Sequence, residues 1–222
     1  EKIIMVCPTW REHLCKPHIH DLPEASESLE FAKSDYYQSW NAVTSSSELS
    51  SIAQEYGYKF IFLPHPYTSR LTSLFEYSDS FTCVRYSDIE TIQDLLAKSA
   101  MLITDYSSVG MEAAFAGLPL IYYQFKETPA FFSSHTVVNG YFSYEKNGFG
   151  PVVTYLSELI SCLSHDMARG CKRQDPYESR AEEFFTLRDG CNCKRVYEKL
   201  MLRSTVEYPL VVENHNKCAN FV

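Results

Sequence analysis

The chain has 222 residues, 45% of them hydrophobic and 22% charged, which is ordinary for a globular protein and excludes a largely disordered one. Its formal net charge is −8, and its lysines and arginines are scattered, which disfavours a protein that binds nucleic acid. The eight cysteines do not follow the spacing of a disulfide-rich secreted domain, so we expect a reducing, cytoplasmic setting.

Short apolar segments alternate with helical ones along the chain. We expect buried parallel strands at residues 2–7, 59–63, 81–85, 101–104 and 120–123. The hydrophobic periodicity and capping residues predict helices at 26–56 (in most of that range, ending at Gly57), 68–77, 88–99, 107–116, 154–166 and 176–202. Residues 11–24 and 131–151 are expected to be loops. This alternation predicts an α/β fold with a doubly wound, parallel, Rossmann-like sheet.

Two polar residues follow the first two predicted strands, and ligands of such sheets bind outside the carboxyl ends of the strands. Arg11 lies in the sequence CPTWRE, where its guanidinium can bind a phosphate in bidentate fashion; an ordinary surface arginine is the alternative. His65 lies in LPHPY, where Pro66 restricts its backbone to extended geometry. Its imidazole can donate to a phosphate or act as an acid.

The fourth predicted strand runs into the sequence ITDYSSVGMEAAFAGLP. Thr104 and Asp105 close the strand, and Ser107 or Ser108 can cap the helix that follows. Capping alone does not account for Glu112. Because helix starts attract phosphate, a pyrophosphate at the two serines would place Glu112, one turn later, beside the ribose of a nucleotide. The stretch therefore predicts a nucleotide diphosphate site.

The chain carries, in this order, the segments PTWRE, LPHPY, LITDYSSVGMEAAFAGLPLIYYQF, GYFSYEKNGFGPVV and RDGCNCKRVYEKL. This series resembles the CDP-glycerol:poly(glycerophosphate) glycerophosphotransferase family, which makes teichoic acids and related phosphate-linked capsule polymers. The resemblance extends to about Leu202. It implies the C-terminal, nucleotide-binding half of a glycosyltransferase-B-type architecture, with residues 1–202 as the CDP-alcohol donor domain and 203–222 as a tail of unknown role.

The same resemblance implies roles for the residues already singled out. Arg11 and His65 are expected to be catalytic, because they would stabilise charge on the CDP leaving group. The residues expected to bind the donor are Thr104, Asp105, Ser107, Ser108, Glu112 and, from the segment 84–87 that would border the cytosine, Arg85.

The chain departs from the family at two positions, Ala100 and Lys126, where the family often has an aspartate. The acceptor-side histidine, which would be the general base, is expected from an N-terminal domain outside this chain. The resemblance further implies a nucleotide-activated alcohol as donor, a polymer or lipid-linked acceptor, and a peripheral position at the inner face of a bacterial membrane. We expect no cofactor, no metal and no nucleic-acid partner.

Two other functions fit the same pattern. A nucleotide-sugar glycosyltransferase or epimerase of the same architecture would need the same phosphate and ribose contacts. A nucleotide-binding module without catalysis of its own is the second alternative.

Two further stretches carry expectations of their own. Four potential metal ligands, His13, Cys15, His18 and His20, fit no standard zinc spacing, so we do not expect a metal there. The aromatic stretch 131–149 is expected to form one wall of the cleft, with Gly148 and Gly150 permitting close approach of the backbone.

Overall fold

The computed structural model describes residues 2–15, 25–126 and 141–204. The chain forms two compact units, Glu1–Phe184 and Phe185–Val222. The predicted donor domain, residues 1–202, thus includes the first unit and most of the helix α10 (Asn192–Ser204) of the second. Its assignment to donor binding stays a prediction. None of the helices in the described residues is long and apolar enough to cross a membrane.

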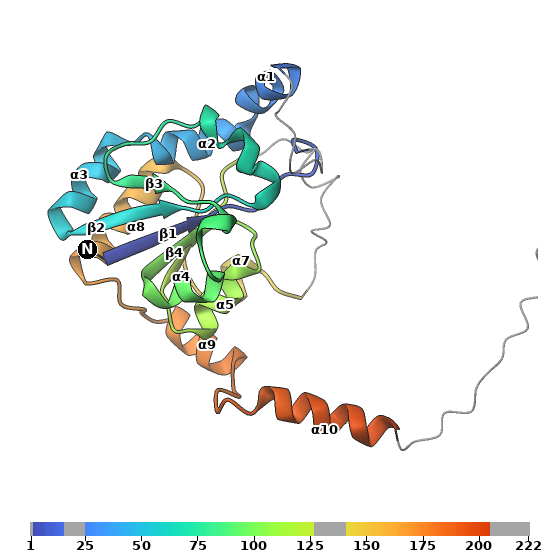
Figure 1. Ribbon diagram of the computed structural model, residues 1–222. Coiled ribbons are helices and arrows are strands. Elements are labelled where there is room, and N and C mark those ends of the chain that lie inside the picture. Colours follow the sequence, from blue (N-terminus) through green and yellow to red (C-terminus); the bar gives the residue numbers. More distant parts are fainter. Residues whose placement is uncertain (1, 16–24, 127–140, 205–222) are drawn as a thin grey trace, which may run out of the picture. The chain divides into compact units, whose positions relative to one another are not determined.

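A six-stranded parallel sheet forms the centre of the first unit (Figure 1). Its strands lie in the order β3-β2-β1-β4-β5-β6, and all five neighbouring pairs are parallel. The strands are β1 (Lys2–Cys7), β2 (Tyr58–Phe62), β3 (Phe81–Cys83), β4 (Ser99–Thr104), β5 (Leu120–Tyr123) and β6 (Val152–Val153). The order reverses between β1 and β4, and this switch point is where doubly wound sheets bind their ligands.

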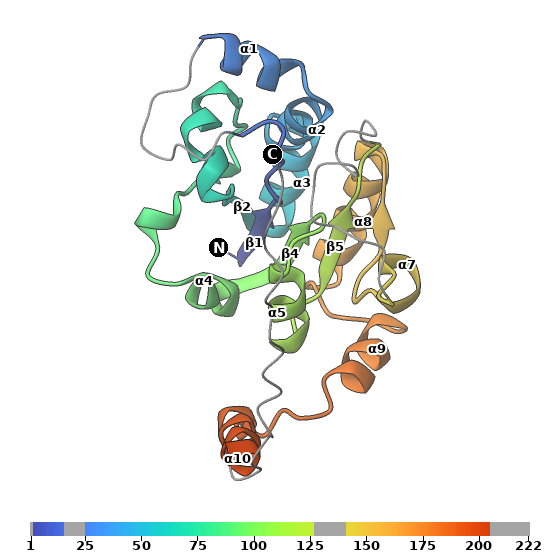
Figure 2. The ribbon, with the colours of Figure 1, turned by 90° about the vertical axis from the view of Figure 1, so that its right-hand side faces the viewer.

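Helices cover both faces of the sheet (Figures 1 and 2). On one face lie α2 (Asp35–Thr44), α3 (Ser47–Tyr56) and α8 (Leu156–Ala168), and on the other lie α4 (Ile92–Lys98) and α5 (Val109–Phe115). The side chains of β1 alternate accordingly: Ile4 and Val6 join the core around Trp40, and all three are fully buried. The predicted doubly wound α/β fold is confirmed.

The range 26–56, predicted to be mostly helical, contains three separate helices. The first is α1 (Ala25–Lys33), and α2 and α3 follow it. Ser34 and Ser46 interrupt the range: each side chain accepts a hydrogen bond, from the Tyr37 and Leu49 amides respectively, both at 3.1 Å. The predicted end at Gly57 is confirmed, since this residue caps α3 in the left-handed conformation.

Other elements differ from the prediction in kind or length. Residues 66–74 form the 3-10 helix η1 (Pro66–Leu74) rather than an α-helix at 68–77, and β3 ends at Cys83, before the short η2 (Tyr86–Asp88). The range 176–202 contains two helices, α9 (Tyr177–Phe184) and α10. The sequence also gave no indication of α7 (Tyr144–Asn147) or of the two-residue strand β6. Residues 131–140 of the predicted aromatic wall lie outside the described residues.

The predicted close approach at Gly148 and Gly150 is confirmed. A Cβ atom at Gly148 would overlap the carbonyl group of Tyr144, and one at Gly150 would overlap the carbonyl group of Leu120 at the start of β5. Neither carbonyl belongs to a flexible side chain, so neither can move aside cheaply. The two glycines thereby allow the segment that leads into β6 to pack at the sheet edge.

We expect Gly150→Ala to lower the free energy of unfolding by about 1–3 kcal/mol, the usual cost of overpacking. Gly110→Ala is the matched control, because a Cβ there would meet its nearest neighbour at 3.4 Å, an ordinary contact. Denaturant unfolding of both variants measures the difference. Equal stability of the two variants would contradict the packing described here.

Candidate functional site

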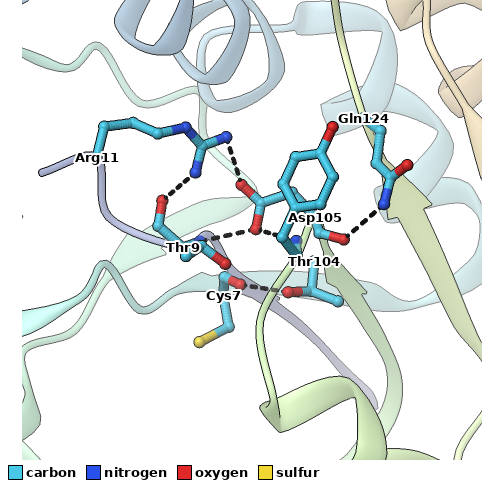
Figure 3. A network of polar contacts seen from close by, with 7 residues as sticks. Cys7, Thr9, Arg11, Thr104, Asp105 and Gln124 are labelled. Carbon is cyan, nitrogen blue, oxygen red and sulfur yellow. Dashed lines mark hydrogen bonds and ion pairs between the residues drawn. The ribbon is translucent and has the colours of Figure 1, made fainter. Parts of the chain in front are cut away.

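The carboxyl ends of β1 and β4 lie side by side at the switch point. Cys7 and Thr104 are register partners, and the Thr104 hydroxyl donates to the Cys7 carbonyl at 2.7 Å. The chain segments that leave these two strands therefore start from neighbouring positions. Thr9 and Arg11 of one segment contact Asp105 of the other directly beyond the sheet (Figure 3).

Asp105 joins the two segments. Its side chain is fully buried, and its carboxylate accepts three hydrogen bonds. The Thr9 and Tyr106 amides donate to Oδ1 at 2.8 and 2.7 Å, and Arg11 Nη2 donates to Oδ2 at 2.9 Å (Figure 3). A buried carboxylate is costly unless it is paired and hydrogen-bonded, and this one is both. Asp105 therefore fixes the path of both segments at once.

Arg11 is the charged partner of Asp105 and is fully buried as well. Besides Asp105, its guanidinium donates from Nη1 to the Thr9 carbonyl at 2.7 Å. Its central carbon lies 5.0 Å from the ring centroid of Tyr36 and 5.7 Å from that of Tyr106, and these rings exclude water. From the sequence, we expected the Arg11 guanidinium to be accessible and to bind a phosphate. In the structure it is buried and pairs with Asp105. Its catalytic role stays a prediction.

His65 follows β2 and begins η1. Its Nδ1 accepts a hydrogen bond from the Tyr67 amide at 3.3 Å, and its ring stacks on Trp10 with the centroids 5.5 Å apart. Burial lowers the pKa of His65 below its ordinary value of 6.5, so the imidazole is neutral at pH 7. Because Nδ1 accepts, the proton of the neutral ring is assigned to Nε2. His65 therefore offers an N–H donor without a charge.

The two serines before α5 differ in their contacts. Ser107 Oγ accepts from the Val109 amide at 3.3 Å, which is the capping role expected from the sequence. Ser108 is exposed, and its hydroxyl makes no capping bond. Capping therefore accounts for Ser107 and leaves the Ser108 hydroxyl available to a ligand.

Glu112 lies one turn into α5 and is only partly buried. Its Oε2 accepts a hydrogen bond from Nε2 of Gln93, on α4, at 2.7 Å. The carboxylate thus has a partner in the protein, and its contact to a ribose stays a prediction.

The segment 84–87, predicted to border the base, leads from β3 into η2. Arg85 is exposed, and its Nε lies 3.3 Å from Oδ2 of Asp88. Tyr86 turns inward: burial, the Cys7 thiol and the Glu112 carboxylate all raise its pKa. Burial also raises the pKa of Cys7 to about 12, so this thiol is protonated and is not a nucleophile at neutral pH. Tyr86 thus links the end of β1 to the region of Glu112.

Three site residues were missed by the sequence analysis: Thr9, Gln93 and Gln124. Gln124 follows β5 and donates from Nε2 to the Asp105 carbonyl at 3.1 Å (Figure 3). Its place directly after a strand was a usable signal. Thr9 acts through its backbone, and Gln93 is a surface glutamine of α4, so neither carried a signal in its residue type.

Of the two departures from the family pattern, Lys126 is exposed just beyond β5, whereas Ala100 lies within β4 and packs against the core. Of the four potential metal ligands, His18 and His20 lie outside the described residues. Within the ranges that are described, no group of three His, Cys, Asp or Glu side chains is arranged to hold a metal ion.

A cavity of about 340 Å³ lies at the opposite end of the sheet. Pro119 and Pro151, which precede β5 and β6, line it together with His165, Lys172 and Arg173. Arg173 donates to the carbonyls of Ala114 and Leu118 at 2.8 and 3.2 Å, so it fixes the end of α5. None of the residues predicted to bind the donor or to be catalytic lines this cavity.

The chain belongs to the CDP-glycerol:poly(glycerophosphate) glycerophosphotransferase family, whose pattern it matches over residues 1–202. It is 29% identical over 201 residues to the minor teichoic acid biosynthesis protein GgaB of Bacillus subtilis (strain 168), covering 90% of this chain and 21% of that protein. It is 28% identical over 206 residues to the teichoic acid poly(glycerol phosphate) polymerase of Bacillus spizizenii (strain ATCC 23059 / NRRL B-14472 / W23). This match covers 90% of this chain and 45% of that protein.

Among solved structures, the wall teichoic acid polymerase TagF has a similar fold, with a TM-score of 0.53 and 19% identity. The match covers 92% of this chain and 44% of that one. The chain thus spans less than half the length of these relatives.

We expect Asp105→Asn to lower the free energy of unfolding by about 3–5 kcal/mol, because it removes the carboxylate charge that pairs with the buried Arg11 guanidinium. Glu112→Gln, which alters a partly exposed hydrogen bond, is the matched carboxyl-to-amide control and should cost about 1 kcal/mol or less. Urea denaturation measures both. A loss below about 1 kcal/mol for Asp105→Asn would contradict the central position of this pair.

We expect the His65 imidazole to titrate with a midpoint below 6.5, because burial disfavours its charged form. A proton NMR titration measures this, with the resonance assigned by its loss in His65→Gln. At pH values below about 6.5, the imidazole is protonated to a greater extent in the unfolded state than in the folded state. The free energy of unfolding should therefore decrease as the pH falls through this range. A midpoint at or above 6.5 would contradict the environment described for the ring.

Proposed function

We propose that this chain is the donor-binding part of a transferase that uses CDP-glycerol or a related CDP-alcohol to build a teichoic-acid-like or capsular polymer. Membership of the glycerophosphotransferase family over residues 1–202 is the observation that carries the proposal. The site at the switch point supports it, because the residues of the matching motifs gather where the sheet order reverses.

The proposed reaction is a phosphoryl transfer. An acceptor hydroxyl oxygen attacks the phosphorus that bears the alcohol, the bond from that phosphorus to the bridging oxygen breaks, and CMP leaves. Positioning and charge stabilisation dominate such reactions. The general base that takes the acceptor proton is expected from the part of the protein outside this chain.

The residues of this chain act on the leaving side of that reaction. The Ser108 hydroxyl and Nε2–H of His65 are neutral donors for the phosphate oxygens on which charge develops. Glu112 would exchange its bond with Gln93 for one from a ribose hydroxyl. Arg11 would act on the phosphate through Asp105 and the segments it fixes, as a positioning residue.

The same proposal includes the acceptor and its location. A polymer or lipid-linked acceptor would bring the full-length protein to the inner face of the membrane, as a peripheral protein. The nucleotide-sugar transferase or epimerase and the non-catalytic module remain the alternatives, and donor titrations separate them from the proposal.

We expect isothermal titration to detect binding of CDP-glycerol or CDP-ribitol to the full-length protein, and not of UDP- or GDP-sugars. Ser108→Ala should weaken binding about tenfold, the effect of one lost hydrogen bond to a charged phosphate. Ser51→Ala, at an exposed serine of α3, is the matched control and should leave binding unchanged. Binding of UDP-sugars in place of CDP compounds would overturn the proposed donor.

The non-catalytic alternative is tested by polymer output. We expect full-length protein with His65→Ala or Ser108→Ala to produce less polymer in an assay with CDP-glycerol, whereas Ser51→Ala should retain output. Unchanged output in both site variants would favour the alternative that this chain binds nucleotide without taking part in catalysis.

A further inference from the structure

A second cavity, of about 560 Å³, lies beside the carboxyl end of β1 and was not used in the account of the donor site. It is formed by the segment after β1, the start of α1 and the start of η1. Two of its walls are aromatic, and most of its polar groups are acidic; these lining residues are Trp10, Tyr67, Glu12, Glu27, Glu30 and His13.

The aromatic walls connect this cavity to His65. Trp10 stacks on the imidazole with an interplanar angle of 21°, and the Tyr67 ring centroid lies 5.2 Å from that of the imidazole. Trp10 and Tyr67 also pack edge to face, with centroids 4.8 Å apart. A group held against these two rings is therefore one side chain away from His65, the residue proposed to face the leaving phosphate.

The charges that line the cavity select against phosphate. Glu12 and Glu30 are exposed at the cavity, and no ion-pair partner for either is found among the described residues. Glu27 is buried and forms an ion pair with Arg70, so its charge is already neutralised. Among the described residues that line the cavity, there is no lysine or arginine. The two carboxylates would repel an anionic ligand.

The same lining suits a neutral group rich in hydroxyls. Carboxylates accept strong hydrogen bonds from hydroxyl donors, and aromatic rings provide apolar surface for the C–H faces of a sugar or polyol. Aromatic walls with a few converging polar groups are also the usual composition of a small-molecule site. A cation could contact the same rings and carboxylates, but Arg70 already neutralises the charge of Glu27.

We propose that this cavity binds an uncharged, hydroxyl-rich unit of the acceptor, a sugar or a polyol, next to His65. The inference rests on the proposed function, because it assigns the acceptor of that reaction. The site would then have two parts. The anionic donor binds near Ser108, and the neutral acceptor unit binds in the cavity, between the aromatic rings and the glutamate carboxylates that line it.

The test is a binding measurement on the full-length protein without donor, so that it does not depend on CDP-alcohol chemistry. Four soluble glycerol-phosphate oligomers are titrated by calorimetry; they differ only in their end group, which is a glycerol hydroxyl, a hexose, a phosphate monoester or a trimethylammonium group. We expect the hexose or glycerol end to bind most tightly and the phosphate end at least fivefold more weakly. The better of the two neutral ends identifies the source of the hydroxyls.

The double variant Glu12→Gln/Glu30→Gln should weaken binding of the neutral-ended oligomer about tenfold and reduce the discrimination against phosphate. Glu55→Gln, at an exposed glutamate of α3 away from the cavity, is the matched control and should change neither. In turnover assays the double variant should raise KM for the acceptor and leave KM for the donor unchanged.

Three results would overturn the inference: unchanged acceptor binding in the double variant, tightest binding of the phosphate end, or tightest binding of the trimethylammonium end. Failure of CDP-glycerol to bind the wild-type protein would instead count against the proposed function. The two failures are distinguishable, because the oligomer titrations contain no nucleotide.

Discussion

The buried ion pair between Arg11 and Asp105 is the interaction on which the candidate site depends. Both side chains are fully enclosed, and they come from segments 94 residues apart in the sequence. The sheet brings these segments to the same edge, but hydrogen bonds between strands end at Cys7 and Thr104. Beyond that point, the contacts of the Asp105 carboxylate with Arg11 and with the Thr9 and Tyr106 amides hold the two segments together.

Such a pair contributes more to the arrangement of the fold than to its net stability. Desolvating two charges costs about as much as their attraction returns, and apolar replacements of such pairs often leave stability unchanged. An apolar pair, however, could not accept hydrogen bonds from the Thr9 and Tyr106 amides. The carboxylate is therefore needed to hold the backbone at Thr9 and at Tyr106, which directly precedes Ser107 and Ser108. On this account, the charge of Arg11 is used within the protein, and neutral donors such as Ser108 and His65 face the ligand.

The sequence was sufficient to predict the α/β architecture and the edge of the sheet at which the motif residues lie. Apolar runs bounded by Pro8, Pro64 and Pro119 marked strands that the structure contains, because buried parallel strands need near-continuous apolar residues. Helix boundaries were less well predicted. The break at Ser34 was not predicted, although this residue begins a new helix. The two-residue strand β6 is too short to leave a periodic pattern.

The contacts within the site could not be derived from the sequence, since they depend on which groups the fold encloses. Arg11 and Asp105 were each recognised as polar residues at a strand end, but nothing in CPTWRE or ITDYSS indicates that they pair with each other. Glu112 illustrates the same limit: its hydrogen bond with Gln93 depends on the packing of α4 beside α5, which a local pattern does not encode. Residue types indicated the location of the site, and packing determined which of its groups remain accessible.

The central claim is that a nucleotide-activated donor binds at the switch point, on segments fixed by Asp105. Hydrogen–deuterium exchange of the full-length protein with and without CDP-glycerol tests it most directly. The account predicts slower exchange at residues 7–11, 63–68 and 104–112 when the nucleotide is bound. Slower exchange confined to residues 161–177, around the cavity at the opposite end of the sheet, would contradict it.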